Sequence, residues 1–137
     1  MRADCHMHTY FSGDSEAKPE EMVLAAIDKG LEAICFTDHE DIDYFCDDIE
    51  FVFDPETYFK ELGALKEKYK EKLDIRIGVE FGLQPHLAKK AKAFTAANPY
   101  DFVIGSMHVV AGRIRIILSS LRGFRMKRPT GWHFGRQ

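Results

Sequence analysis

Four short apolar segments limit the folds that this chain can adopt. They span residues 3–8, 31–36, 74–80 and 100–108, and stretches with helical periodicity separate them. Strands that alternate with helices in this way form parallel sheets with right-handed crossovers. The pattern therefore predicts an α/β fold, built either as a small open sheet or as half of a barrel.

Helix signals lie between these segments. Pro19 is followed by two acidic residues, which fits a first helical turn, and Gly30 fits the end of that helix. Asp54 is a typical N-cap residue in front of a second helix, and a third helix is expected over residues 84–96. The acidic and aromatic segment 43–53 is predicted to fold over the carboxyl ends of the strands.

Each apolar segment ends at a residue that can bind a metal ion: His6 and His8, then His39, Glu80 and His108. Alternate residues of a strand point to the same face, so the first two histidines point the same way. A single strand histidine is usually just a hydrogen-bonded side chain. Sites of parallel α/β proteins gather at the carboxyl ends of the strands, however, and four strands repeat the pattern here. We therefore expect these side chains to share metal ions.

These motifs together resemble the polymerase and histidinol phosphatase (PHP) family of metal-dependent phosphoesterases. The motifs are His6-x-His8, Asp14 in the following loop, Thr37-Asp38-His39, Gly78-x-Glu80 and Gly105-Ser106-x-His108. Segments 8–14 and 82–86 are most similar to the histidinol-phosphatase branch, and the resemblance covers about residues 3–112. It implies the first half of a seven-stranded, distorted TIM-like barrel.

The resemblance also implies a site for up to three divalent ions, namely zinc, manganese or iron. It assigns ligands to three positions: His6, His8 and Glu80; Glu80 with His108; and Asp14 with His39. Glu80 and His108 are the implied catalytic residues, because paired cations lower the pKa of a water molecule and offset the charge on a phosphoryl group. Imidazole and carboxylate donors suit such ions. The implied substrate is a small phosphate ester, L-histidinol phosphate, hydrolysed to L-histidinol and phosphate in histidine biosynthesis.

Several residues have a second interpretation. Asp14 is either a metal ligand or the side chain of an Asx turn. His86 is either a substrate contact or a residue that caps the start of a helix. Asp38 is interpreted as a residue that orients a ligating histidine rather than as a ligand. Cys5 and Cys35 have apolar neighbours and are predicted to be buried thiols rather than zinc ligands.

Charge is divided unevenly along the chain. Residues after Gly112 contain seven of the 19 Lys and Arg residues and none of the 22 Asp and Glu residues. Histidinol phosphatases of this type usually continue here with D-P-Y-Y-P-x-F-F. Codons for residues 113–133 can be chosen so that a shifted reading frame encodes DPYYPEFFTWFPNEEAYRVA. We therefore predict a partial PHP domain over residues 1–112 and a basic tail over residues 113–137 that arises from a frameshift, and nucleic acid is not expected as a partner.

The favoured function is a histidinol-phosphate phosphatase that is impaired in this form, because the later ligands of the family and half of its barrel are missing. The alternatives are another PHP-type phosphoesterase or nuclease, and an inactive metal-binding fragment. The sequence has no apolar run that could span a membrane and no signal-peptide pattern, which predicts a cytoplasmic protein. The open edge of a half-barrel predicts self-association.

Overall fold

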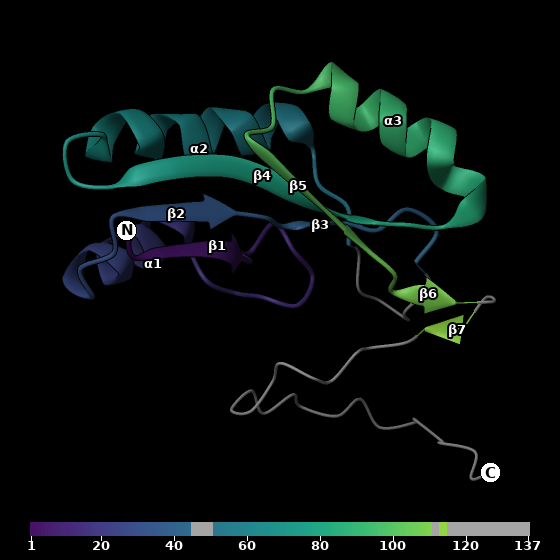
Figure 1. The fold of residues 1–137 in the computed structure, drawn as a ribbon, viewed down its shortest axis with the longest axis horizontal. Coiled ribbons are helices and arrows are strands. Elements are labelled where there is room, and N and C mark those ends of the chain that lie inside the picture. The colour runs from purple at the N-terminus through teal and green to yellow at the C-terminus, as the bar shows by residue number, and fades with distance from the viewer. Residues whose placement is uncertain (45–50, 111–112, 115–137) are drawn as a thin grey trace, which may run out of the picture.

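A computed structural model describes residues 1–44, 51–110 and 113–114 of the chain (Figure 1). The strands are β1 (Ala3–Met7), β2 (Ala33–Phe36), β3 (His39–Glu40), β4 (Asp74–Gly82), β5 (Phe102–Ser106), β6 (Val109–Val110) and β7 (Arg113–Ile114). The helices are α1 (Pro19–Asp28), α2 (Pro55–Tyr69) and α3 (Ala88–Ala97), and η1 (Pro85–Leu87) is a 3-10 turn. The predicted alternation of strands and helices is confirmed.

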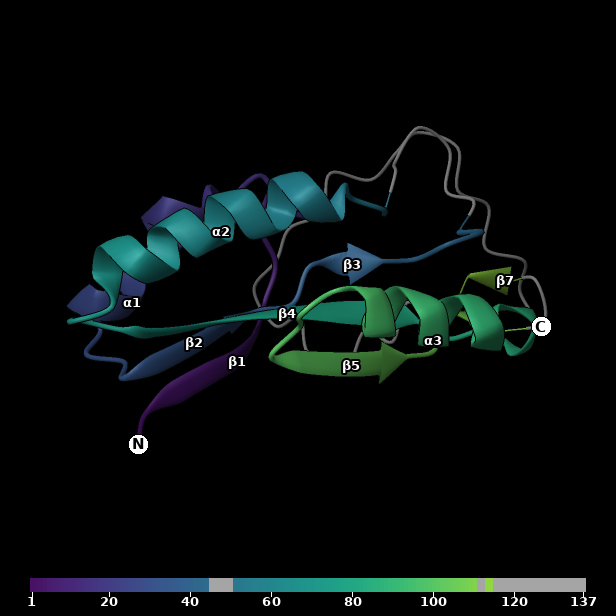
Figure 2. The same ribbon diagram turned by 90° about the horizontal axis from the view of Figure 1, so that it is seen from above.

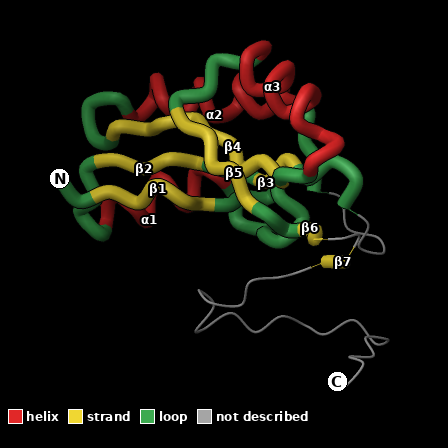
Figure 3. Tube along the Cα trace, turned by 45° about the vertical axis from the view of Figure 1, so that its right-hand side comes forward, coloured by secondary structure: helices red, strands yellow, loops and turns green. Residues whose placement is uncertain are grey.

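The first five strands form one parallel sheet (Figure 3). Its pairing runs from β1 through β2 to β4, and β5 pairs with β4. The short strand β3 continues β2 in the same register, because Phe36 pairs with Ile77 and His39 pairs with Glu80, three residues further along both strands. Parallel strands and their helices thus form the predicted half-barrel, with neighbouring carboxyl ends at one edge.

Helices α1 and α2 cover one face of this sheet (Figure 2). The core between these layers consists of Val23, Ala26, Ile34, Phe36, Tyr58, Leu62, Leu65, Leu73, Ile75 and Ile77. Burying an apolar side chain of this size contributes about 1.5–3 kcal/mol relative to leaving it exposed. Along β4, the buried residues that alternate with this set are Gly78, Glu80 and Gly82. The face away from α1 and α2 therefore carries the polar residue that the sequence singles out.

The predicted starts of the first two helices agree with the structure. Helix α1 begins at Pro19, and Gly30 follows it with a positive φ of 67°, a conformation that glycine adopts without strain. The carboxylate of Asp54 accepts a hydrogen bond of 2.9 Å from the backbone N–H of Thr57 and caps α2. The predicted third helix, 84–96, is divided into η1 and α3.

Other expectations need correction or lie outside the described residues. Cys35 is buried, but Cys5 is exposed, so its predicted burial is wrong. The reason is that β1 pairs with β2 alone among the described strands, which leaves it at the sheet edge. Positions 45–50 of the predicted excursion, and the basic tail from residue 115, lie outside the described residues. None of the helices in the described ranges has the length and apolar character needed to cross a membrane.

Candidate metal centre

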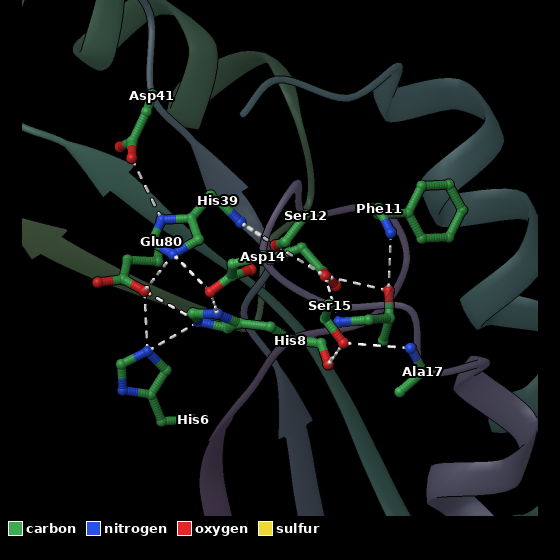
Figure 4. A network of polar contacts seen from close by, with 12 residues as sticks. His6, His8, Phe11, Ser12, Asp14, Ser15, Ala17, His39, Asp41 and Glu80 are labelled. Atoms are coloured by element: carbon green, nitrogen blue, oxygen red, sulfur yellow. Dashed lines mark hydrogen bonds and ion pairs between the residues drawn. The ribbon is translucent and has the colours of Figure 1, made fainter. Parts of the chain in front are cut away.

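Glu80 lies at the centre of the converging side chains (Figure 4). Its Oε2 atom is 2.8 Å from His6 Nε2 and 3.0 Å from His8 Nε2. Its Oε1 atom is 3.1 Å from His108 Nε2 and accepts a hydrogen bond of 2.6 Å from Ser106 Oγ. One buried carboxylate therefore faces histidines that come from strand β1 and its carboxyl end, at one edge of the described sheet, and from the segment after β5, at the other edge, so it could contribute to two metal-binding groups.

A second cluster continues from His8 toward β3. His8 Nδ1 is 3.1 Å from Asp14 Oδ2, and that oxygen is 3.5 Å from His39 Nε2. His39 Nε2 is also 3.7 Å from Glu80 Oε2, which connects the two clusters. Three overlapping groups each offer ligand atoms within 4.8 Å of one another: His6, His8 and Glu80; His8, Asp14 and His39; and His39, Glu80 and His108. Each group could hold a metal ion, and together they contain all six predicted ligands.

Asp38 holds the loop that carries Asp14. Its Oδ1 atom accepts hydrogen bonds from the backbone N–H of Thr9 at 2.5 Å, from Thr9 Oγ1 at 3.0 Å and from Ser12 Oγ at 3.0 Å. Ser12 Oγ in turn accepts a hydrogen bond of 2.8 Å from the backbone N–H of His39. In the described part of the chain, Asp38 thus orients a loop and a backbone segment rather than an imidazole ring.

Sequence reasoning missed Asp41. Its Oδ2 atom is 2.7 Å from His108 Nδ1 and 3.3 Å from His39 Nδ1, and its side chain is 4% exposed. The sequence position of Asp41 could have indicated it, because an acid two residues after His39 on an extended segment points to the same face as His39.

The predicted substrate contact, His86, lies outside this cluster. Its side chain is 60% exposed, and its Nε2 atom is 3.0 Å from Asp43 Oδ2. Asp43 has a positive φ of 60°. The pair connects η1 to the segment that follows β3, so the proximity of His86 to a substrate stays a prediction.

The electrostatics of the cluster favour protons on the histidines when no cation is bound. Burial disfavours a charged imidazole at His8, but hydrogen bonds to Asp14 and Glu80 outweigh it and raise its pKa to about 10. At His108, burial is likewise outweighed by Asp41 and Glu80, and the pKa rises to about 9. Burial acts to raise the pKa of Glu80, but hydrogen bonds from His108, His8 and Ser106 lower it well below its usual range. A metal ion that bound here would have to displace protons from these rings.

Comparison with known proteins identifies relatives of this architecture. A family model for the PHP domain matches residues 4–133. The histidinol-phosphatase of Lactococcus lactis is 38% identical over 109 residues, covering 80% of this chain and 40% of that protein. A probable histidinol-phosphatase of Clostridium acetobutylicum is 37% identical over 112 residues, covering 82% of this chain and 41% of that protein. The chain thus spans about two fifths of the length of these relatives.

Solved structures show the same fold. The crystal structure of histidinol phosphate phosphatase from Lactococcus lactis, complexed with zinc, L-histidinol and phosphate, has a TM-score of 0.76 at 37% identity and is matched over 81% of this chain and 41% of that chain. A structure from Listeria monocytogenes has a TM-score of 0.70 at 24% identity, covering 78% of this chain and 45% of that chain. The similarity to the Listeria monocytogenes structure shows a shared fold and nothing more.

The family model runs past Gly112, where the basic segment begins, so the division of the chain at this position stays a prediction. The match nevertheless includes every strand end that contributes to the metal centre. With a family model that matches most of its length and strands arranged like those of solved relatives, the chain belongs to the PHP domain family.

Proposed function

We propose that this chain carries part of the active site of a metal-dependent histidinol-phosphate phosphatase. The observation that carries the proposal is the convergence of six ligand-type side chains in three overlapping groups, with Glu80 common to two of them. The relatives named histidinol-phosphatase support the substrate, L-histidinol phosphate. The relative that is complexed with zinc, L-histidinol and phosphate supports zinc as the metal.

The donor set fits zinc, manganese or iron, because these ions accept imidazole nitrogen and carboxylate oxygen. Bound ions would lower the pKa of a water molecule and offset the charge of a phosphoryl group. The proposed ligands are His6, His8, Asp14, His39, Glu80 and His108. Of these, Glu80 and His108 are proposed to lie next to the reacting atoms. Ser106 donates a hydrogen bond to Glu80 Oε1, so it holds this carboxylate, which would be shared by two ions, in one orientation.

We further propose that phosphatase activity is weak in the chain as it stands and strong when the reading frame after Gly112 is restored. The proposal follows from the basic segment 113–137, which contains seven Lys and Arg residues and no Asp or Glu residue. It predicts that DNA sequencing across the codons for residues 112–113 finds the shifted frame that encodes D-P-Y-Y-P.

The experiment measures phosphate release from L-histidinol phosphate by the zinc-loaded chain and by its frame-restored version. We expect turnover by the restored protein and little by the 137-residue chain. Robust turnover by the chain as it stands would show that its activity is not impaired. Preference for single-stranded DNA or for unrelated phosphomonoesters would favour another PHP-type hydrolase. Zinc binding without turnover by either protein would favour the alternative that the chain is an inactive metal-binding fragment.

The pH dependence of zinc binding follows from the histidine pKa values. Zinc should bind more tightly as the pH rises from 6 to 8, by up to about tenfold per unit for each proton displaced. His8, with a pKa raised from 6.5 to about 10, stabilises the ion-free fold fully below pH 6.5 and loses this contribution as the pH rises toward 10. Thermal unfolding should therefore show a falling Tm without zinc and a growing zinc-induced increase of Tm. A pH-independent zinc affinity would contradict this assignment.

Self-association and a cytoplasmic location are further proposals. Strand β1 has four exposed residues out of five and stands at the edge of the described sheet. Phe102 and Val103 of β5 are also exposed, at 47% and 43%. Such edges pair readily with other chains. Free Cys5 and Cys35 are consistent with a reducing compartment.

A further inference from the structure

One oxygen of Asp41 lies close to the Nδ1 atoms of two candidate ligands, His39 and His108. Asp41 Oδ2 is 2.7 Å from His108 Nδ1 and 3.3 Å from His39 Nδ1. The other ring nitrogen of each histidine faces Glu80, at 3.1 Å for His108 Nε2 and 3.7 Å for His39 Nε2. A neutral imidazole that donates a hydrogen bond from Nδ1 has its free lone pair on Nε2. Asp41 therefore favours the tautomer in which His108 offers Nε2 to the centre of the cluster. His39 Nδ1 has no hydrogen-bond partner among the described residues, and it lies within ion-pair distance of the same carboxylate oxygen.

The strand register places Asp41 beside a glycine that leaves room for its side chain. Strand β3 pairs with β4 through His39 with Glu80 and Glu40 with Phe81, so the next residue, Asp41, lies beside Gly82. A Cβ atom on Gly82 would lie 2.1 Å from Asp41 Oδ1. Gly82 does not have a positive φ, since Gly30 is the glycine with that conformation in the described ranges. Position 82 therefore requires a residue without a side chain, because the carboxylate of Asp41 occupies that space.

The burial of the Asp41 carboxylate also destabilises the fold. Its side chain is 4% exposed, and its Oδ1 atom has no hydrogen-bond partner among the described residues. A buried carboxylate oxygen without a donor lowers the free energy of unfolding. The two histidines that its other oxygen contacts give a reason for an acid at this position that packing does not.

We propose that Asp41 is a positioning residue for two metal positions at once. It holds the Nδ1 atoms of His39 and His108, so that the ion bound through Asp14 and His39 and the ion bound through Glu80 and His108 depend on one carboxylate. Groups that orient ligating histidines in this way typically change metal affinity by about 10–100-fold when they are removed. The inference rests on the proposed function, because it needs the metal centre. It adds a connection through Asp41 to the one that His39 and Glu80 already make.

The test compares four variants of the full chain. Asp41→Ala removes the acceptor, Asp41→Asn keeps an amide oxygen in its place, and Gly82→Ala pushes the carboxylate aside without changing any polar group. Asp74→Ala is the matched control, because Asp74 is an exposed acid that pairs with Arg76 at the far end of β4. Zinc per chain and zinc affinity are measured by competition with a chelator, and NMR records the Nδ1–H signals of the two histidine rings in the zinc-loaded chain.

We expect Asp41→Ala to weaken zinc binding by about 10–100-fold and to shift both Nδ1–H signals together. Asp41→Asn should lie between the wild type and Asp41→Ala, and Gly82→Ala should reproduce the loss. The control should bind as the wild type does. Unchanged affinity and unchanged ring signals in Asp41→Ala would overturn the inference while the metal centre stands. Failure of the wild type to bind zinc would overturn the proposed function as well, and if Asp41→Ala does not fold, Gly82→Ala decides the question in the same assay.

Discussion

Replacing Glu80 with glutamine is expected to remove most divalent-ion binding from this chain. The carboxylate has contacts on both oxygens, with His6 and His8 at Oε2 and with His108 at Oε1. An amide keeps the shape of the side chain, but it loses the negative charge and presents a donor on one side. Because partners that merely orient ligands contribute about 10–100-fold to affinity, loss of a shared ligand should weaken zinc binding by more than about 100-fold.

The measurement is the zinc content of the purified Glu80→Gln variant after equilibration with a zinc buffer, with circular dichroism to confirm the fold. Glu40→Gln is a matched control, because Glu40 is similarly buried, at 5% exposure, and lies one strand away. Its Oε2 atom accepts a hydrogen bond of 3.3 Å from the backbone N–H of Phe53, which an amide oxygen can accept equally well. Burial raises the pKa of Glu40 to about 7, so the loss of charge costs little there.

If Glu80→Gln retains the zinc content of the wild type while folding normally, the cluster around Glu80 is not a metal centre. Equal losses in Glu80→Gln and Glu40→Gln would point to a general effect of removing buried carboxylates. A loss confined to Glu80→Gln would support the ligand assignment for the residues that share its two oxygens.

The convergence of the cluster could be predicted from sequence because it follows from topology. Parallel strands align their carboxyl ends, so His8, His39, Glu80 and His108 had to come close if the strands were assigned correctly. The position of Asp14 does not follow from topology, because a loop residue has no strand to fix it. In the structure, the side chain of Asp38 supplies that constraint through hydrogen bonds to Thr9 and Ser12.

Features that depend on packing between distant segments could not be predicted. Asp41 lies two residues after His39, which indicates its side of the segment, but its contact with His108 depends on the short strand β3 and on the space beside Gly82. A strand of two residues leaves no periodic pattern in the sequence. The exposure of Cys5 has a similar cause, since apolar neighbours along a strand do not reveal what covers its edge. Hydrophobic periodicity thus predicts the helices and strands and their order, whereas the burial and the partners of single side chains depend on contacts between distant segments.

The sheet that carries the centre should be sensitive to one added methyl group. In Gly78→Ala, the new Cβ atom would lie 2.7 Å from the carbonyl oxygen of Phe102, 3.0 Å from Cys35 Sγ and 3.1 Å from the carbonyl oxygen of Phe36. Two of these three atoms belong to the backbone of neighbouring strands, so the clash is relieved by moving strands apart. Overpacking of this kind typically costs about 1–3 kcal/mol. We expect the free energy of unfolding to fall by this amount in urea titrations.

The same substitution at Gly63 should have the opposite effect. Gly63 lies inside α2, and a Cβ atom placed there meets nothing within 4 Å. Alanine is favoured over glycine in a helix by about 0.5–1 kcal/mol, so Gly63→Ala should stabilise the chain. Gly78 pairs with Phe102 at the start of the β4–β5 ladder, which places His108 beside Glu80. Gly78→Ala should therefore weaken zinc binding as well as stability, whereas equal stability changes in the two variants would show that β5 does not depend on the close approach at Gly78.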